Sequence, residues 1–399
     1  MSEAVPLLAP AGGVPPVVAT AAALDAAVVA LAGGTGPVAV DAERASGYRY
    51  SQRAYLVQLR RAGSGTVLLD PTAVDDLRAV AEVLNPAEWV LHAASQDLPS
   101  LAELGFAPAR LFDTELAGRL AGFPRVGLGP LVEQLLGYRL EKGHGAADWS
   151  RRPLPRDWLA YAALDVELLL PLRDAMAGEL EAQGKTEWAI EEFEAARTAD
   201  PPALRTEPWR RTSGIHRVRT PRQLAAVREL WTARERRARD HDIAPGRILP
   251  DSALVAAALA DPADEAALLA LPVFGGRAQR RRVRVWSGAL RAARELAGSA
   301  LPATQPPQEG PPPANRWEDR DPAAAARLAT ARAALAELAE RHLVPVQNLL
   351  APDLVRRLCW QPPAPDDPGA VDGALAAGGA RRWQRQLTVG PLTDALRAQ

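Results

Sequence analysis

Two proline-rich stretches constrain the fold of this 399-residue chain more than any other feature of its sequence. Clustered prolines favour an extended polyproline geometry and interrupt helices and sheets. A chain of this length also exceeds what one small hydrophobic core can organise. We therefore expect three folded blocks, with linkers at residues 196–217 and 298–321. Residues 1–20 are expected to form a flexible tail.

The first block, residues 21–195, alternates short apolar runs with helical stretches. Runs bounded by Gly and Pro predict strands, and these come first in the block. A strand-helix alternation follows, which predicts an α/β domain with a mixed sheet. The expected strands are PVAVDAE (37–43), AYLVQLRR (54–61), GTVLLDP (65–71) and WVLHAA (89–94), and the expected helices lie at 74–84, from Gln96 and from Thr114.

The second and third blocks, residues 218–297 and 322–399, read as all-helical. Thr220 followed by Pro221 is typical of a helix N-terminus. The two blocks also resemble each other at a spacing near 100 residues, since DIAPGRILPD (242–251) matches HLVPVQNLLA (342–351). A long period present twice predicts a duplicated helical domain rather than a solenoid.

Composition excludes several classes of protein. The single cysteine, Cys359, cannot form an internal disulfide or anchor a zinc cluster. No stretch is apolar over the roughly 18 residues that a membrane span needs, and no signal peptide is evident, so a cytoplasmic protein is expected. The formal net charge of -1 means that binding to a polyanion would require local basic patches.

Acidic residues fall at positions where α/β domains form sites. Asp41 and Glu43 are two apart on a predicted strand and therefore project from one face. Asp97 follows another strand, and Tyr161 and Asp165 are four apart on a predicted helix, which places both on one face. Each short pattern by itself is also compatible with a solvated surface.

Four carboxylates without a cysteine cluster suit Mg²⁺ or Mn²⁺, which prefer oxygen ligands. Two such ions roughly 3.5 to 4 Å apart can stabilise both the attacking and the leaving oxygen of a phosphoryl displacement. The residues therefore predict a phosphodiesterase with two metal ions.

The order of these motifs resembles the ribonuclease D family, 3′-to-5′ exoribonucleases in the tyrosine-containing branch of the DEDD superfamily. The motifs are Asp41-x-Glu43, LHAASQD (91–97), LFDTELAGRLAG (111–122) and ADWSRRPLPRDWLAYAALD (147–165). Both helical blocks are similar to HRDC domains, the nucleic-acid-binding modules that follow the nuclease in this family. The resemblance implies a ribonuclease H-like exonuclease domain, an HRDC domain and a second, divergent HRDC-like domain.

The resemblance also implies a role for each site residue. Asp41 would bridge both metal ions, Glu43 and Asp165 would complete the site of the nucleophile-side ion, and Asp97 would hold the second ion, partly through water. Tyr161 would orient the attacking water, because a phenol with a pKa near 10 is a poor base unless its pKa is perturbed.

Other residues carry weaker hypotheses. His144 lies in a Gly-rich loop before the expected active-site helix and could contact substrate or be a plain loop residue. His92 is expected to pack at the end of a strand. Trp286 and Trp383 could stack on bases, although burial in helical cores is expected. A basic run could contact phosphate or form a solvated face, and it comprises Arg277, Arg280, Arg281, Arg282 and Arg284.

The family resemblance implies removal of nucleoside 5′-monophosphates from single-stranded RNA 3′ ends, with tRNA precursors as expected substrates. No membrane and no obligate protein partner are expected. A DNA exonuclease of the Werner type would share the same carboxylates, and an inactive RNA-binding scaffold is the remaining alternative. The division into blocks further predicts that cleavage of a short oligonucleotide survives deletion of residues 218–399.

Overall fold

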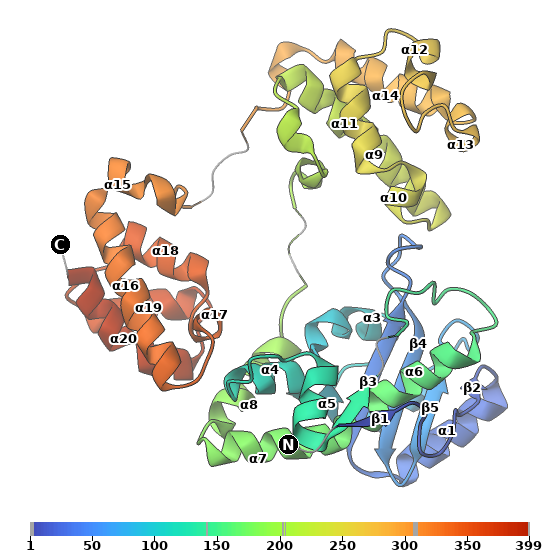
Figure 1. The fold of residues 1–399 in the computed structure, drawn as a ribbon, viewed down its shortest axis with the longest axis vertical. Helices are drawn as coiled ribbons and strands as arrows, with labels where there is room; N and C mark the ends of the chain where they lie inside the picture. Colours follow the sequence, from blue (N-terminus) through green and yellow to red (C-terminus); the bar gives the residue numbers. More distant parts are fainter. Residues whose placement is uncertain (1–3, 141–142, 202, 204, 306–309, 398–399) are drawn as a thin grey trace.

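The computed structural model describes residues 4–140, 143–201, 203, 205–305 and 310–397. An α/β domain is followed by two helical domains, as the sequence predicts (Figure 1). Within the described residues, no helix is both long enough and apolar enough to cross a membrane.

A six-stranded mixed sheet forms the centre of the first domain, in the order β2-β5-β4-β3-β6-β7. β4 is antiparallel to both of its neighbours, β3 and β5, whereas β2 pairs in parallel with β5, and β6 and β7 continue the sheet in parallel from β3. The strands are β2 (Val17–Val18), β3 (Thr35–Arg44), β4 (Ala54–Ala62), β5 (Gly65–Leu69), β6 (Glu88–Leu91) and β7 (Arg110–Asp113).

The part of residues 1–20 that the structure describes is not the loose tail that the sequence suggested. β1 (Val5–Leu7) pairs in parallel with β8 (Tyr138–Leu140), and β2 pairs with β5. Both segments satisfy backbone groups at strand edges that would otherwise lack partners. A single-strand pattern of two or three residues gives too little periodicity to be detected in the sequence.

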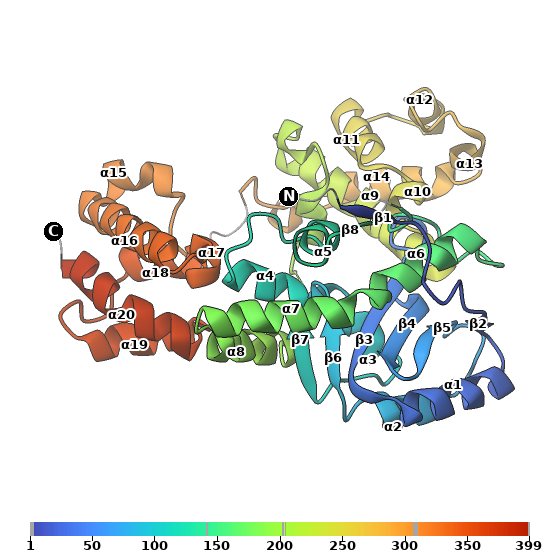
Figure 2. The same cartoon turned by 60° about the horizontal axis from the view of Figure 1, so that its bottom comes forward.

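Helices cover both faces of the sheet (Figure 2). Adjacent residues of one strand pack to opposite sides, since Leu56 joins a cluster with Ala162 and Ala163, while Val57 joins the main core. The helices of this domain are α1 (Ala21–Gly33), α2 (Arg78–Leu84), α3 (Leu98–Ala102), α4 (Thr114–Leu120), α5 (Leu128–Leu136), α6 (Arg156–Glu167), α7 (Leu169–Ala182) and α8 (Thr186–Arg197).

The second domain has a hydrophobic core of its own around Trp286 and Phe274. Its first helix begins with a capping box between Thr220 and Gln223, in agreement with the sequence pattern. Trp209 lies within the expected linker but is buried in this core. The helices are α9 (Pro221–His241), α10 (Pro245–Ile248), α11 (Asp251–Ala260), α12 (Glu265–Leu269), α13 (Arg277–Arg280) and α14 (Val283–Glu295).

The third domain repeats a long helix, a short helix and a further helix in the same order. A buried glutamine marks the equivalence, because Gln279 donates to the Ile248 carbonyl and Gln384 donates to the Asn348 carbonyl, each at 2.7 Å. The helices are α15 (Trp317–Arg320), α16 (Pro322–Arg341), α17 (Val346–Leu349), α18 (Pro352–Trp360), α19 (Pro368–Ala377) and α20 (Arg382–Arg397).

Both helical domains contact the nuclease domain. Asp242, at the end of α9, accepts hydrogen bonds from the amides of Tyr50 and Ser51 in the β3–β4 connection. In the third domain, Trp383 stacks on Trp188 of α8 with ring centroids 4.8 Å apart. The third domain and the nuclease share one continuous hydrophobic core, whereas the contact of the second domain includes several polar groups.

Candidate active site

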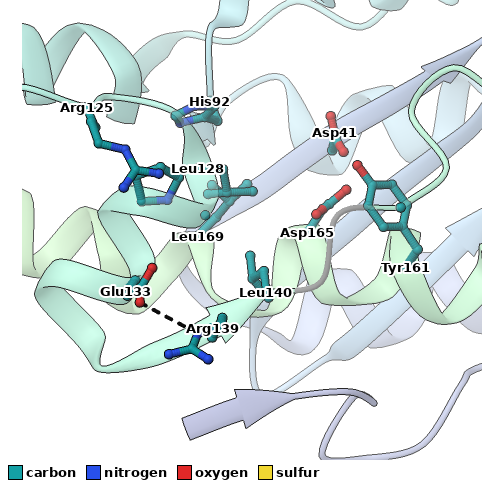
Figure 3. Close-up of a pocket in the computed structure, with 13 residues that line it drawn as sticks. Asp41, His92, Arg125, Leu128, Glu133, Arg139, Leu140, Tyr161, Asp165 and Leu169 are labelled. Carbon is teal, nitrogen blue, oxygen red and sulfur yellow. Dashed lines mark ion pairs between the residues drawn. The ribbon is translucent and has the colours of Figure 1, made fainter. Parts of the chain in front are cut away.

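Three carboxylates meet where β3 lies against α6. Asp41 and Glu43 project from one face of β3, with Ala42 on the other side between them. Asp165 reaches the same point from α6, and one ligand atom from each of the three residues lies within 4.8 Å of the others. Figure 3 shows Asp41 and Asp165 one above the other, with the Tyr161 ring to their right.

Asp97 approaches this cluster from the turn after β6. Its carboxylate pairs with Arg44 Nη2 at 3.4 Å, and the charge of Asp41 contributes to its raised pKa. Asp97 is not part of the close group of three, although it is buried beside it. The structure therefore brings all four predicted carboxylates to one site, where Arg44, the last residue of the strand that carries Asp41, pairs with Asp97.

Asp113 holds the turn that presents Asp97. Its buried carboxylate accepts hydrogen bonds from the amides of Ala93 and Ala94 at 3.1 and 2.8 Å. It also caps α4 by accepting from the amide of Glu115. Ala93 has φ of 60°, an uncommon conformation for a residue with a side chain, which these hydrogen bonds stabilise.

The carboxylates perturb one another because they are buried with little compensating charge. Burial raises the pKa of Asp41 to about 6 and that of Asp97 to about 8. Burial and the neighbouring carboxylates raise the pKa of Glu43 well above its ordinary value, and burial and Asp41 do the same for Asp165. A cluster of oxygen ligands whose ionised forms repel one another is the donor set that hard divalent cations stabilise.

Tyr161 lies one helical turn before Asp165, and the two side chains form a hydrogen bond. Burial and the adjacent carboxylates raise the pKa of Tyr161 above that of a free phenol. Gly143 packs so closely on the tyrosine ring that an added Cβ would lie 2.6 Å from Tyr161 Cδ2. The ring is therefore held in place, and its hydroxyl remains protonated and able to donate or accept a hydrogen bond.

A cavity of about 590 Å³ opens beside the carboxylates and extends toward α5 and β8. Asp41, Asp165 and Tyr161 line one end (Figure 3). Two further residues that sequence reasoning had not assigned to the site, His92 and Arg125, line it as well. His92 was within reach of sequence reasoning, since it lies in the LHAASQD motif five residues before Asp97.

Gln58 was also missed. It is the cross-strand neighbour of Asp41 and is fully buried, yet neither polar atom of its side chain has a hydrogen-bond partner among the described residues. Buried amides without partners are rare in folded proteins. A single glutamine within an apolar strand does not indicate from sequence alone that its side chain will be buried beside Asp41.

The weaker candidates lie in two places. The His144 ring lies edge-on to the Tyr161 ring, with the ring centroids 5.9 Å apart, and His144 Nε2 lies 3.4 Å from an Asp157 carboxylate oxygen. The basic run extends over α13, the two residues that follow it and the start of α14, and its exposed members are Arg277, Arg280, Arg281 and Arg284. Trp286 and Trp383 are buried, as expected, and are not available as exposed stacking platforms.

Family comparisons agree with this architecture. Residues 16–181 match a family described as a 3′-5′ exonuclease, residues 223–290 match the HRDC domain, and residues 310–396 match a 3′ to 5′ exonuclease C-terminal domain. The fold and the acidic cluster thus define a 3′-5′ exonuclease of the DEDD type with an HRDC domain.

The chain belongs to the ribonuclease D family. It is 34% identical to ribonuclease D from Gluconacetobacter diazotrophicus over 341 residues, and this aligned region covers 83% of this chain and 82% of the relative. It is 35% identical over 290 residues to ribonuclease D from Acidiphilium cryptum, covering 69% and 72% of the two chains.

Solved structures show the same arrangement. A protein from Bifidobacterium adolescentis has a TM-score of 0.91 and 38% identity, with 99% of this chain and 100% of that chain covered. Escherichia coli RNase D has a TM-score of 0.69 at 23% identity, covering 96% and 98% of the two chains, which shows a common fold. The protein is therefore a 3′-5′ exoribonuclease of the ribonuclease D type.

Proposed function

We propose that the protein hydrolyses phosphodiester bonds at single-stranded 3′ ends of RNA with two divalent cations and releases nucleoside 5′-monophosphates. The observation that carries the proposal is the convergence of Asp41, Glu43 and Asp165 within 4.8 Å. When bound, two Mg²⁺ or Mn²⁺ ions would acidify a water molecule and stabilise the attacking and leaving oxygens.

The side chains have separate proposed roles. Asp41 would contact both ions, Glu43 and Asp165 would complete the site of the nucleophile-side ion, and Asp97 would hold the other ion, partly through water. Arg44 pairs with Asp97, and its guanidinium group would orient that carboxylate. Tyr161 would position the attacking water through its hydroxyl, because its raised pKa excludes a role as a ready base.

The second domain is proposed to hold the body of a structured RNA, such as a tRNA precursor, while its 3′ end enters the nuclease. The chain as a whole carries a formal charge of -1, so contact with phosphates requires a local basic surface. The exposed arginines from Arg277 to Arg284 form this basic surface. The Escherichia coli relative is described as an exoribonuclease involved in structured RNA processing, which agrees with this assignment.

The proposal is tested with 5′-labelled single-stranded RNA and DNA of one sequence in Mg²⁺, Mn²⁺ or chelator. We expect stepwise shortening of the RNA from its 3′ end, metal dependence, and nucleoside 5′-monophosphates as products. Asp41→Asn should abolish shortening, because it removes a charged ligand at nearly constant volume. Asp25→Asn, at an exposed aspartate of α1, is the matched control and should retain full activity.

Each contrary outcome identifies a different alternative. RNA binding without shortening in either metal would identify a scaffold. Preferential degradation of DNA would identify a DNA exonuclease. Full activity of Asp41→Asn would contradict the assigned site.

A further inference from the structure

His92 lines the cavity but has no part in the roles proposed for the four carboxylates and Tyr161. It follows directly after β6, and its ring lines the same cavity as Asp41, Tyr161 and Asp165 (Figure 3). It is separate from the acidic cluster of Asp41, Glu43 and Asp165. Its contacts determine which of its two ring nitrogens can act on a substrate.

Thr114 fixes the orientation of the ring. His92 Nδ1 lies 2.9 Å from Thr114 Oγ1, and the same hydroxyl lies 3.2 Å from the Leu91 carbonyl oxygen. Thr114 is fully buried at the start of α4, where Asp113 caps the helix. The threonine therefore has little freedom to rotate away.

These two contacts determine the tautomer. The hydroxyl of Thr114 has one proton, and the Leu91 carbonyl can only accept a hydrogen bond. Both contacts are hydrogen bonds when Thr114 donates to Leu91 and His92 Nδ1–H donates to Thr114. The proton of the neutral ring is then on Nδ1, which leaves Nε2 with a lone pair.

The environment keeps this acceptor available. Burial lowers the pKa of His92 to about 4, although Glu115 opposes the shift, so the ring is neutral at physiological pH. No hydrogen bond engages Nε2 within the described part of the chain. A lone pair in this position calls for a hydrogen-bond donor from the substrate.

Few groups of an RNA 3′ end can donate to it. Phosphate oxygens only accept hydrogen bonds, and base donors differ from one nucleotide to the next. Ribose hydroxyls are donors that every RNA end carries, and the 2′-hydroxyl is the one that distinguishes RNA from DNA.

We propose that His92 Nε2 accepts a hydrogen bond from the 2′-hydroxyl at the 3′ end of the substrate, so that His92 is a specificity-determining residue for RNA. Thr114 is the positioning residue that sets the tautomer. This inference rests on the proposed function, because it assumes that an RNA 3′ end occupies the cavity.

The test compares oligoribonucleotides that differ only in the last two nucleotides, carrying ribose, 2′-deoxyribose, 2′-O-methylribose or a terminal 3′-deoxyribose. For the wild-type protein we expect kcat/KM to fall about tenfold when the donating hydroxyl is removed, the effect of one hydrogen bond. His92→Phe keeps a ring of similar size without an acceptor. It should lower cleavage of the ribose substrate while leaving the 2′-deoxy substrate nearly unchanged.

Thr114 provides an independent pair of variants. Thr114→Val removes the hydroxyl and should reduce the preference for ribose, because either His92 tautomer then becomes accessible. Thr114→Ser retains the hydroxyl and should restore the preference. The ratio of kcat/KM for the ribose substrate to kcat/KM for the 2′-deoxy substrate separates a positioning role from a structural one. General destabilisation would lower both values alike and leave the ratio unchanged.

Thermal unfolding verifies that each variant folds, and equilibrium binding of the same oligonucleotides in chelator repeats the comparison without catalysis. Loss of discrimination against the 3′-deoxy rather than the 2′-deoxy end would assign the 3′-hydroxyl as the donor and overturn the role of His92 in RNA specificity, because DNA also carries that hydroxyl. An unchanged preference in both His92→Phe and Thr114→Val would overturn the inference. Failure of the wild type to cleave RNA would count against the proposed function alone, because the binding comparison would still test His92.

Discussion

The two helical domains share an order of helices and a buried glutamine, yet they are attached to the nuclease in different ways. The second domain has its own core, and Asp242 and Arg247 form polar contacts with the β3–β4 connection. The core of the third domain is continuous with that of the nuclease, through the stacked rings of Trp188 and Trp383. One copy thus packs around a core of its own, while the core of the other is part of the nuclease core.

This difference changes the expectation that residues 218–399 are dispensable for cleavage of a short oligonucleotide. Removing the third domain would expose the apolar surface of α8 that Trp383 covers, so we expect the nuclease itself to lose stability. Removing the basic surface alone would leave that core intact.

The largest expected effect is the loss of stability when a buried tryptophan is replaced, and it should fall on different unfolding transitions in the two helical domains. Trp383→Ala should cost about 3–5 kcal/mol in the unfolding transition that the nuclease shares with the third domain. Trp286→Ala should cost a similar amount, confined to the second domain, because its core is separate. Differential scanning calorimetry measures both transitions.

Trp383→Phe is the control, since it keeps an aromatic ring on Trp188 but loses the hydrogen bond from Nε1 to Glu192. It should destabilise the protein less than Trp383→Ala. If Trp286→Ala and Trp383→Ala lowered the same transition equally, the proposed contrast between the domains would be wrong.

The equivalent glutamines test whether the repeat has a common packing requirement. Gln279→Leu and Gln384→Leu each leave a carbonyl without its buried donor, and we expect each to cost about 1–3 kcal/mol. Urea unfolding followed by tryptophan fluorescence measures the loss. A cost for one variant and none for the other would show that the glutamines are not equivalent.

The basic surface is tested by RNA affinity. Arg281→Gln combined with Arg284→Gln should weaken binding of a structured RNA and reduce the salt dependence of its association by roughly two phosphate contacts. Arg332→Gln combined with Arg382→Gln removes the same charge from exposed positions of the third domain and should have little effect. Equal weakening by both pairs would show that the two domains hold RNA alike.

The smallest expected effect concerns the attachment of the second domain. Partial burial opposes ionisation of Asp242, but hydrogen bonds from Ser51 dominate and lower its pKa. Because the pKa in the folded state is depressed, the contact contributes fully above the unfolded-state pKa of about 4 and is lost as the pH falls through the folded value.

Asp242→Asn should remove this dependence, with little change in cleavage of a short oligonucleotide near pH 7. Small-angle scattering from pH 6 to pH 3 would follow the separation of the domain. A wild-type profile that does not change over this range would contradict the role of Asp242.

The sequence by itself determined the strands β3 to β6, the three-block organisation and the identity of the acidic residues, although it did not predict β1, β2, β7 or β8. Those features depend on local periodicity, since Asp41 and Glu43 share a face at strand spacing, and Tyr161 and Asp165 share one at helical spacing. The family motifs identified the same residues in their order along the chain.

Only the tertiary structure decided which groups meet across the chain. The pairing of Arg44 with Asp97, the Thr114 contact of His92, the strands formed near the N-terminus and the merging of the third domain with the nuclease all join segments distant in sequence or separated by turns. Such contacts depend on the directions of side chains once a core has formed. Local spacing does not carry that information, because similar patterns of apolar and polar residues are compatible with many arrangements in space.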